Sequence, residues 1–196
     1  MRVIIYVDGA VGVGKSTFIE ILERTFASVF MVLNSNSKKS HNHNVGVLPE
    51  PLHRDWTQRI IGELGYDELL HFLLIRKIVA IENWSMKIAC DGMQELENNV
   101  LIVERSIHGD RRVNEDCEEL FEELDVRYTG ESVHHIFISN GREESEEQKR
   151  LNVLYSKLEG ELGGRASKYI HRISRPRHIS SYYAEAAAIV RNVIGL

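Results

Sequence analysis

Cysteine and proline are scarce in this chain of 196 residues, which holds two cysteines and three prolines. The two cysteines, Cys90 and Cys117, are too few and too widely spaced to indicate a disulfide framework or a zinc site. We therefore expect free thiols in a reducing compartment. No proline-rich or glycine- and serine-rich linker divides the sequence, so we expect a single domain spanning 1–196.

Long apolar runs and an excess of basic residues are missing as well. No run of 18 apolar residues occurs, and the first nine residues, MRVIIYVDG, run into a glycine-rich segment and are too short for a signal peptide. The formal net charge is -5, whereas a nucleic-acid-binding surface is usually basic. We therefore expect a cytoplasmic protein whose partners include neither a membrane nor a nucleic acid.

What the chain does contain is an alternation of apolar strands and amphipathic helices. Strands are expected at 2–8, 29–33, 100–103, 133–139 and 169–173. Helices are expected at 15–26, 56–64, 66–97, 113–124 and 181–194, and the polar segment 34–47 is expected to be a loop. This alternation predicts an α/β fold with three layers, in which a five-stranded parallel sheet is flanked by helices.

Residues 9–16, GAVGVGKS, match the pattern Gly-x-x-x-x-Gly-Lys-Ser/Thr and are called the phosphate loop below. Glycines let backbone N–H groups converge on a phosphate without interference from Cβ atoms. Lysine can reach the β- and γ-phosphates, and the serine hydroxyl can ligate Mg²⁺. The predicted nucleotide-binding residues are Gly9, Ala10, Gly12, Gly14, Lys15, Ser16 and Thr17.

The phosphate loop by itself does not separate GTPases, ATPases and kinases. The sequence has no guanine-reading Asn-Lys-x-Asp motif, and no predicted strand ends in the Asp-Glu pair of many ATPases. Two charged segments follow predicted strands instead: 49–56 (PEPLHRDW) and 104–111 (ERSIHGDR). Ligands of open α/β sheets bind outside the carboxyl ends of the strands, so Glu50, Glu104 and Arg105 are expected to converge near the phosphate loop.

In this order, the three segments resemble the deoxynucleoside kinase family, of thymidine kinase and deoxycytidine or deoxyguanosine kinase type, over residues 1 to about 112. The second charged segment is similar to the family's E-R-S-x-x-S-x-R stretch, with Gly109 in place of the second serine. The short chain and compact lid resemble members encoded by large DNA viruses. The resemblance implies that ATP and Mg²⁺ are used to phosphorylate the 5′-hydroxyl of a deoxynucleoside in nucleotide salvage. It also implies a homodimer paired through the long helices.

The resemblance assigns a role to each charged residue near the phosphate loop. Glu50 would be the general base at the 5′-hydroxyl. Arg105 would hold the substrate and, with Lys15, stabilise charge on the transferred phosphoryl group. Ser16 and Glu104 would hold Mg²⁺. A rigid proline loop around Glu50 and a structural ion pair at Glu104 and Arg105 are the alternative interpretations.

The resemblance also supplies candidate substrate-binding residues. Trp56 would stack on the nucleobase, and Tyr66 would contact the sugar 3′-hydroxyl. The family's Phe-Gln pair on the long helix is represented by His71 and Phe72 without the glutamine, which leaves the choice of base open. A pair found in cytidine- and purine-accepting members would be formed by Arg76 and Asp110. Core packing of Trp56 and Tyr66, and separate surface ion pairs for the last two residues, are the alternatives.

The lid that covers the phosphates in the family is shortened here. Arg142 matches a lid arginine, and Glu144 matches the glutamate that contacts the sugar, whereas Arg175 and Arg177 would lie near the ATP adenine. A solvated charged helix at 143–160 is the alternative. Two other functions remain open: a nucleoside monophosphate kinase such as thymidylate kinase, and a catalytically weak nucleotide-binding regulator.

Overall fold

The computed structural model describes residues 2–36, 44–50, 55–65, 69, 72–73, 75–81, 83–84, 99–106, 133–139, 145–175 and 178–195. The strands are β1 (Arg2–Gly9), β2 (Asn44–Leu48), β3 (Asn99–Glu104), β4 (Val133–Ser139) and β5 (Ile170–Ser174). The helices are α1 (Lys15–Asn36), α2 (Asp55–Leu64), α5 (Glu146–Leu162), α6 (Ala166–Tyr169) and α7 (Ile179–Ile194), with a 3₁₀ turn at Gly163–Arg165. Residues 75–81 and 83–84 are helical as well.

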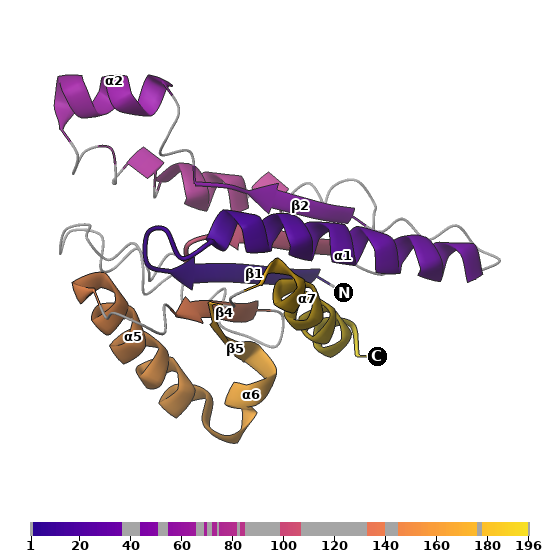
Figure 1. Cartoon of the computed structure of the whole chain (residues 1–196). Helices are drawn as coiled ribbons and strands as arrows, with labels where there is room; N and C mark the ends of the chain where they lie inside the picture. The colour runs from indigo at the N-terminus through magenta and orange to yellow at the C-terminus, as the bar shows by residue number, and fades with distance from the viewer. Residues whose placement is uncertain are drawn as a thin grey trace.

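The five strands form one parallel sheet in the order β2-β3-β1-β4-β5. The central strand β1 is buried, as expected of a strand covered by helices on both faces. Because all strands run in the same direction, their carboxyl ends meet at one edge of the sheet (Figure 1). The predicted α/β fold with a five-stranded parallel sheet and flanking helices is therefore confirmed.

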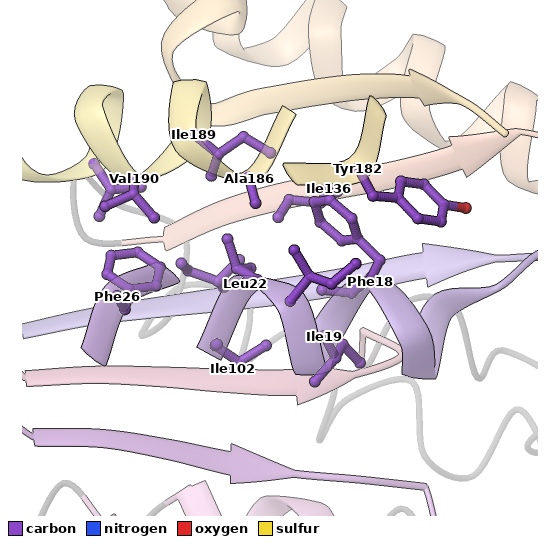
Figure 2. Close-up of a cluster of buried hydrophobic side chains, with 14 of the residues drawn as sticks. Phe18, Ile19, Leu22, Phe26, Ile102, Ile136, Tyr182, Ala186, Ile189 and Val190 are labelled. Carbon is purple, nitrogen blue, oxygen red and sulfur yellow. The ribbon is translucent and has the colours of Figure 1, made fainter. Parts of the chain in front are cut away.

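One face of the sheet is covered by α1 and α7, which lie side by side (Figure 1). Figure 2 shows the side chains between them, which include Phe18, Leu22, Phe26, Tyr182, Ala186, Ile189 and Val190. Their spacing of three or four residues places them on one stripe of each helix. Burial of each large side chain contributes about 1.5–3 kcal/mol, so this stripe fixes α1, and with it the phosphate loop.

The opposite face of the sheet is covered by the helical residues 75–81 and 83–84 and by α5. Ile4 and Tyr6 of β1 alternate with the residues that face α1, and they pack against Ile81. Farther along the sheet, Phe137 of β4 stacks on Tyr155 of α5, with ring centroids 4.6 Å apart. Three layers result, as predicted. None of the described helices combines the length and the apolar character needed to span a bilayer.

The second strand is not where the sequence pattern placed it. Residues 29–33 belong to α1, which continues to Asn36, and the strand β2 at Asn44–Leu48 begins inside the segment 34–47 that was predicted to be a loop. The apolar run VFMVL has helical spacing when read with the preceding turn, because Phe26, Phe30 and Leu33 share one face and pack into the core. A short apolar run does not distinguish a strand from the end of a helix.

Two histidines lie next to each other between β4 and β5. His134 Nδ1 and His171 Nε2 are 3.3 Å apart, and the rings stack at an interplanar angle of 17°. Burial lowers the pKa of His171 from 6.5 to about 4. The folded protein therefore resists a proton that the unfolded chain accepts.

The low pKa of His171 predicts a loss of stability in mild acid. Above pH 6.5 the group is neutral in both states, whereas between pH 6.5 and about 4 only the unfolded chain takes up the proton. The free energy of unfolding should therefore fall by about 2 kcal/mol between pH 7 and pH 5. Urea denaturation at both pH values measures this change. The fall should shrink in His171→Gln and persist in His178→Gln, which alters an exposed histidine; an equal fall in both variants would contradict this origin.

Candidate active site

The phosphate loop connects the end of β1 to the first turn of α1, and two of its glycines have steric reasons to be there. A Cβ atom at Gly9 would lie 2.5 Å from the carbonyl oxygen of Ile138. Gly14 has φ of +97°, and a Cβ there would lie 3.1 Å from the hydroxyl of Tyr182. Side chains at these positions would clash or strain the backbone, so the turn requires glycine.

Tyr182 of α7 supports the phosphate loop from behind. Its hydroxyl donates a hydrogen bond to the carbonyl of Val13 at 3.1 Å, and its ring packs edge-on against Phe18. Desolvation by burial raises the pKa of Tyr182, so the phenol stays protonated and remains a donor at neutral pH. A residue near the end of the chain thus holds one carbonyl of a loop near its beginning.

The side chain of Lys15 folds back onto the start of the phosphate loop. Its Nζ donates hydrogen bonds to the carbonyls of Gly9 at 2.9 Å and Ala10 at 3.1 Å, and the side chain is buried. Burial lowers the pKa of Lys15 and the charge of Arg105 lowers it further, whereas Glu104 and nearby glutamates oppose the shift. The ammonium is thus positioned to exchange carbonyl oxygens for phosphate oxygens.

Glu104, the last residue of β3, connects the phosphate loop to the segment after β2. Its Oε1 accepts a hydrogen bond from the Ser16 hydroxyl at 2.9 Å, and its Oε2 accepts one from the backbone N–H of Glu50 at 3.1 Å. A hydroxyl and a carboxylate are the oxygen donors that Mg²⁺ prefers. Within the described residues, no cluster of three or more histidine, cysteine or carboxylate side chains could hold a metal alone. Ser16 and Glu104 therefore fit an Mg²⁺ ion, which they would hold through their side-chain oxygens.

The backbone of Arg105 adopts a left-handed conformation, with φ of +62°. Such a conformation is strained for a residue with a side chain and persists only where the surroundings enforce it. Here the N–H of Arg105 donates to the carbonyl of Val7 at 2.9 Å. The next N–H, that of Ser106, donates at 2.9 Å to Asp8 Oδ1, and Asp8 Oδ2 accepts from the Tyr155 hydroxyl at 2.6 Å. The end of β1 thus fixes the turn that follows β3.

This turn places the guanidinium of Arg105 between two carboxylates. Its Nε lies 2.7 Å from Glu50 Oε2, and its Nη1 donates to Glu147 Oε1 at 2.8 Å. The Nε contact is an ion pair without good hydrogen-bond alignment. The three side chains are only 9–12% exposed, so the charges interact with little screening by solvent. The other oxygen of Glu147 accepts the backbone N–H of Val11, in the phosphate loop, at 3.0 Å.

A cavity of about 300 Å³ opens between the phosphate loop and these charged groups. Its lining consists of Val11, Gly12, Gly14, Lys15, Ser16, Thr17, Glu50, Glu104 and Arg105. The structure thus brings together most of the residues predicted from the phosphate loop and the three predicted charged residues after β2 and β3. The volume is in the range of small-molecule sites. Anion-binding N–H groups, two cations and carboxylates in one cavity suit the binding of a phosphorylated ligand with a metal ion.

Other predicted residues lie elsewhere or outside the described residues. Phe72 is 47% exposed and Arg76 is half-buried, and neither lines the cavity. Arg175 is exposed at the end of β5, where its N–H donates to the carbonyl of Ser139 at 2.8 Å. The residues outside the described part of the chain are Tyr66, His71, Asp110, Arg142, Glu144 and Arg177, and the side chain of Trp56 is also outside it.

Glu147, Tyr155 and Tyr182 contact the site and were not predicted from the sequence. For Glu147 a signal exists in the helical spacing. Leu151, Tyr155 and Leu158 form the buried stripe of α5, and Glu147 stands one turn before it on the same face. A charged residue on an otherwise apolar stripe indicates that a partner of opposite charge, or a hydrogen-bond donor, is buried beside it. The alternative of a solvated charged helix therefore holds for Glu146 and Lys149, which are exposed, but not for this face.

No protein-family profile and no curated protein sequence matches this chain. Among solved structures, a thymidylate kinase from Ehrlichia chaffeensis is similar, with a TM-score of 0.58 over 97% of this chain and 98% of that chain. The sequence identity is 16%, so the likeness establishes the fold alone. The chain therefore has the same fold as this thymidylate kinase.

The contact between Tyr182 and the phosphate loop predicts a defect in nucleotide binding when the hydroxyl is removed. Tyr182→Phe keeps the ring and leaves the buried Val13 carbonyl without this donor, which costs about 1 kcal/mol. The Kd for MgATP, measured by calorimetry, should therefore rise about fivefold. The matched control is Tyr183→Phe on the exposed side of α7, which should bind MgATP as the wild type does. Equal affinities for both variants would show that the Tyr182 hydroxyl does not hold the loop in its binding conformation.

Proposed function

We propose that this chain is an Mg²⁺- and ATP-dependent kinase that phosphorylates a nucleoside or a nucleoside monophosphate. The observation that carries the proposal is the ion pair between Glu50 and Arg105, 2.7 Å apart in the wall of the cavity that contains the phosphate loop. A phosphate loop alone supports only nucleotide binding. A carboxylate and an arginine beside it add the groups needed to position an acceptor hydroxyl or phosphate and to stabilise the transferred group.

Each residue of the cavity has a task in such a transfer. The N–H groups of the loop and Lys15 bind the donor phosphates. Ser16 and Glu104 would hold Mg²⁺, which supplies charge neutralisation at the phosphates when it is bound. Glu50 accepts the proton of an acceptor hydroxyl, and Arg105 both orients the Glu50 carboxylate and stabilises negative charge on the moving phosphoryl group.

Two acceptor classes are supported by different observations. The structural likeness to a thymidylate kinase supports a nucleoside monophosphate acceptor, as thymidylate kinases take. The ion pair with Glu50 supports a neutral deoxynucleoside, because the Glu50 carboxylate already offsets the charge of Arg105 that would attract an acceptor phosphate. The Glu-Pro and Glu-Arg-Ser segments of the deoxynucleoside kinases support the second class as well.

A panel of acceptors tests the proposal and separates the two classes. Purified protein is incubated with MgATP and, in turn, with each deoxynucleoside and each deoxynucleoside monophosphate, and ADP formation is measured. The charges near Arg105 predict faster turnover with a deoxynucleoside. Turnover with thymidylate or another monophosphate alone would support the thymidylate kinase type. Binding of ATP without transfer to any acceptor would leave a nucleotide-binding regulator and contradict the kinase proposal.

Glu50→Gln tests the role of Glu50 as the general base. The amide keeps the size of the side chain but cannot accept the proton, so kcat should fall about 100-fold or more. The Kd for MgATP should change little, because the role proposed for Glu50 is at the acceptor and not at ATP. Glu63→Gln, an exposed change on α2, is the control with the same chemistry. A kcat near that of the wild type would remove Glu50 from the role of base.

A further inference from the structure

The carboxylate of Glu147 bridges two parts of the candidate active site. Glu147 lies in the first turn of α5, and its side chain is only 12% exposed. One oxygen accepts from Arg105 Nη1 at 2.8 Å, and the other accepts from the N–H of Val11 at 3.0 Å. Val11 belongs to the phosphate loop and Arg105 to the turn after β3, and both residues line the cavity. A single anion therefore contacts both the loop that would bind the donor and the arginine that would act on the transferred group.

The N–H of Val11 is the kind of group that a phosphate loop offers to phosphate oxygens. Backbone N–H groups in such loops bind anions, and a carboxylate oxygen satisfies them as a phosphate oxygen does. The two cations are also engaged within the protein: Lys15 donates to loop carbonyls, and Arg105 contacts Glu50 and Glu147. The negative charge of Glu147 thus lies on a backbone N–H of the phosphate loop.

We infer, on the basis of the proposed ATP-dependent reaction, that Glu147 is a gate for the donor nucleotide. Before ATP binds, its carboxylate occupies the N–H of Val11 and one side of the Arg105 guanidinium. A donor phosphate then displaces the carboxylate from the loop, because two anions cannot share this N–H and they repel each other at close range. Arg105 loses this contact at the same moment and becomes available to the phosphoryl group.

The displacement does not require α5 to move. The helix is held by Leu151, Tyr155 and Leu158, which are buried, and by the hydrogen bond from Tyr155 to Asp8. Tyr155 lies about two helical turns beyond Glu147, which is a distance of about 12 Å along the axis. A change of the Glu147 rotamer in the first turn is therefore enough to release the loop, and the helix stays anchored behind it.

The gate predicts that removing the charge of Glu147 strengthens nucleotide binding. In Glu147→Gln, the neutral amide makes a weaker hydrogen bond to Val11 and does not repel the phosphates. The Kd for MgATP, measured by calorimetry without an acceptor, should therefore fall about fivefold. Glu146→Gln removes the same charge one residue away, from a side chain that is 90% exposed and pairs with Lys149. This control should bind MgATP as the wild type does.

The direction in which the Kd for MgATP changes separates a gate from a purely structural role of Glu147. If Glu147 only held the loop in shape, its loss would weaken MgATP binding, so equal or weaker binding by a folded Glu147→Gln would overturn the gate. The wild type gives an independent test that needs no substitution: MgATP should shift the carboxyl ¹³C resonance of Glu147 and leave that of Glu146 unchanged, and no shift would overturn the gate. A wild type that does not bind MgATP would overturn the proposed function as well, whereas normal wild-type binding with no gain in the variant would overturn the gate alone.

Discussion

The buried carboxylate of Asp8 is the interaction on which the geometry of the site depends. It lies near the end of β1, is 1% exposed, and accepts hydrogen bonds from the N–H of Ser106 and from the hydroxyl of Tyr155. Burying a carboxylate costs several kcal/mol unless its oxygens are hydrogen-bonded. Moving Ser106 or Tyr155 away from Asp8 would therefore be costly, and both residues are held in place. Burial and the charge of Asp8 raise the pKa of Tyr155 far above its usual value, which keeps the phenol a donor. Three segments, β1, the turn after β3, and α5, are thereby joined at one point.

This junction fixes the positions of the charged side chains in the candidate active site. Arg105 precedes Ser106, and its strained backbone is tied on both sides to β1. Glu147 precedes Tyr155 by two turns of α5, so the same anchor sets the reach of its side chain. The resulting network pairs the Arg105 guanidinium with the carboxylates of Glu50 and Glu147. A network of this kind is rigid when complete, and it yields only to a ligand that offers replacement charges.

Much of the fold and part of the site could be predicted because their causes are local in the sequence. The phosphate loop is recognisable since its glycines, Lys15 and Ser16 each serve the backbone or the phosphates within eight residues. Glu104 and Arg105 were found because parallel strands bring their carboxyl ends to one edge. The pattern failed at residues 29–33, where a short apolar run satisfies both a strand and the last turns of a helix. The packing of Phe30 and Leu33 against the core selects the helix there, and the spacing of apolar residues does not reveal that packing.

The residues that support the site escaped prediction because their partners are distant in the chain. Val11 and Glu147 are 136 positions apart, Asp8 and Tyr155 are 147 apart, and Val13 and Tyr182 are 169 apart. Helical spacing identifies the buried face of α5 or α7, but it does not say which loop that face meets. Local sequence thus predicts a phosphate-binding loop, whereas side chains from the last third of the chain hold the conformation of that loop. A phosphate-loop motif therefore predicts the class of ligand, but it does not predict which distant side chains contact the loop.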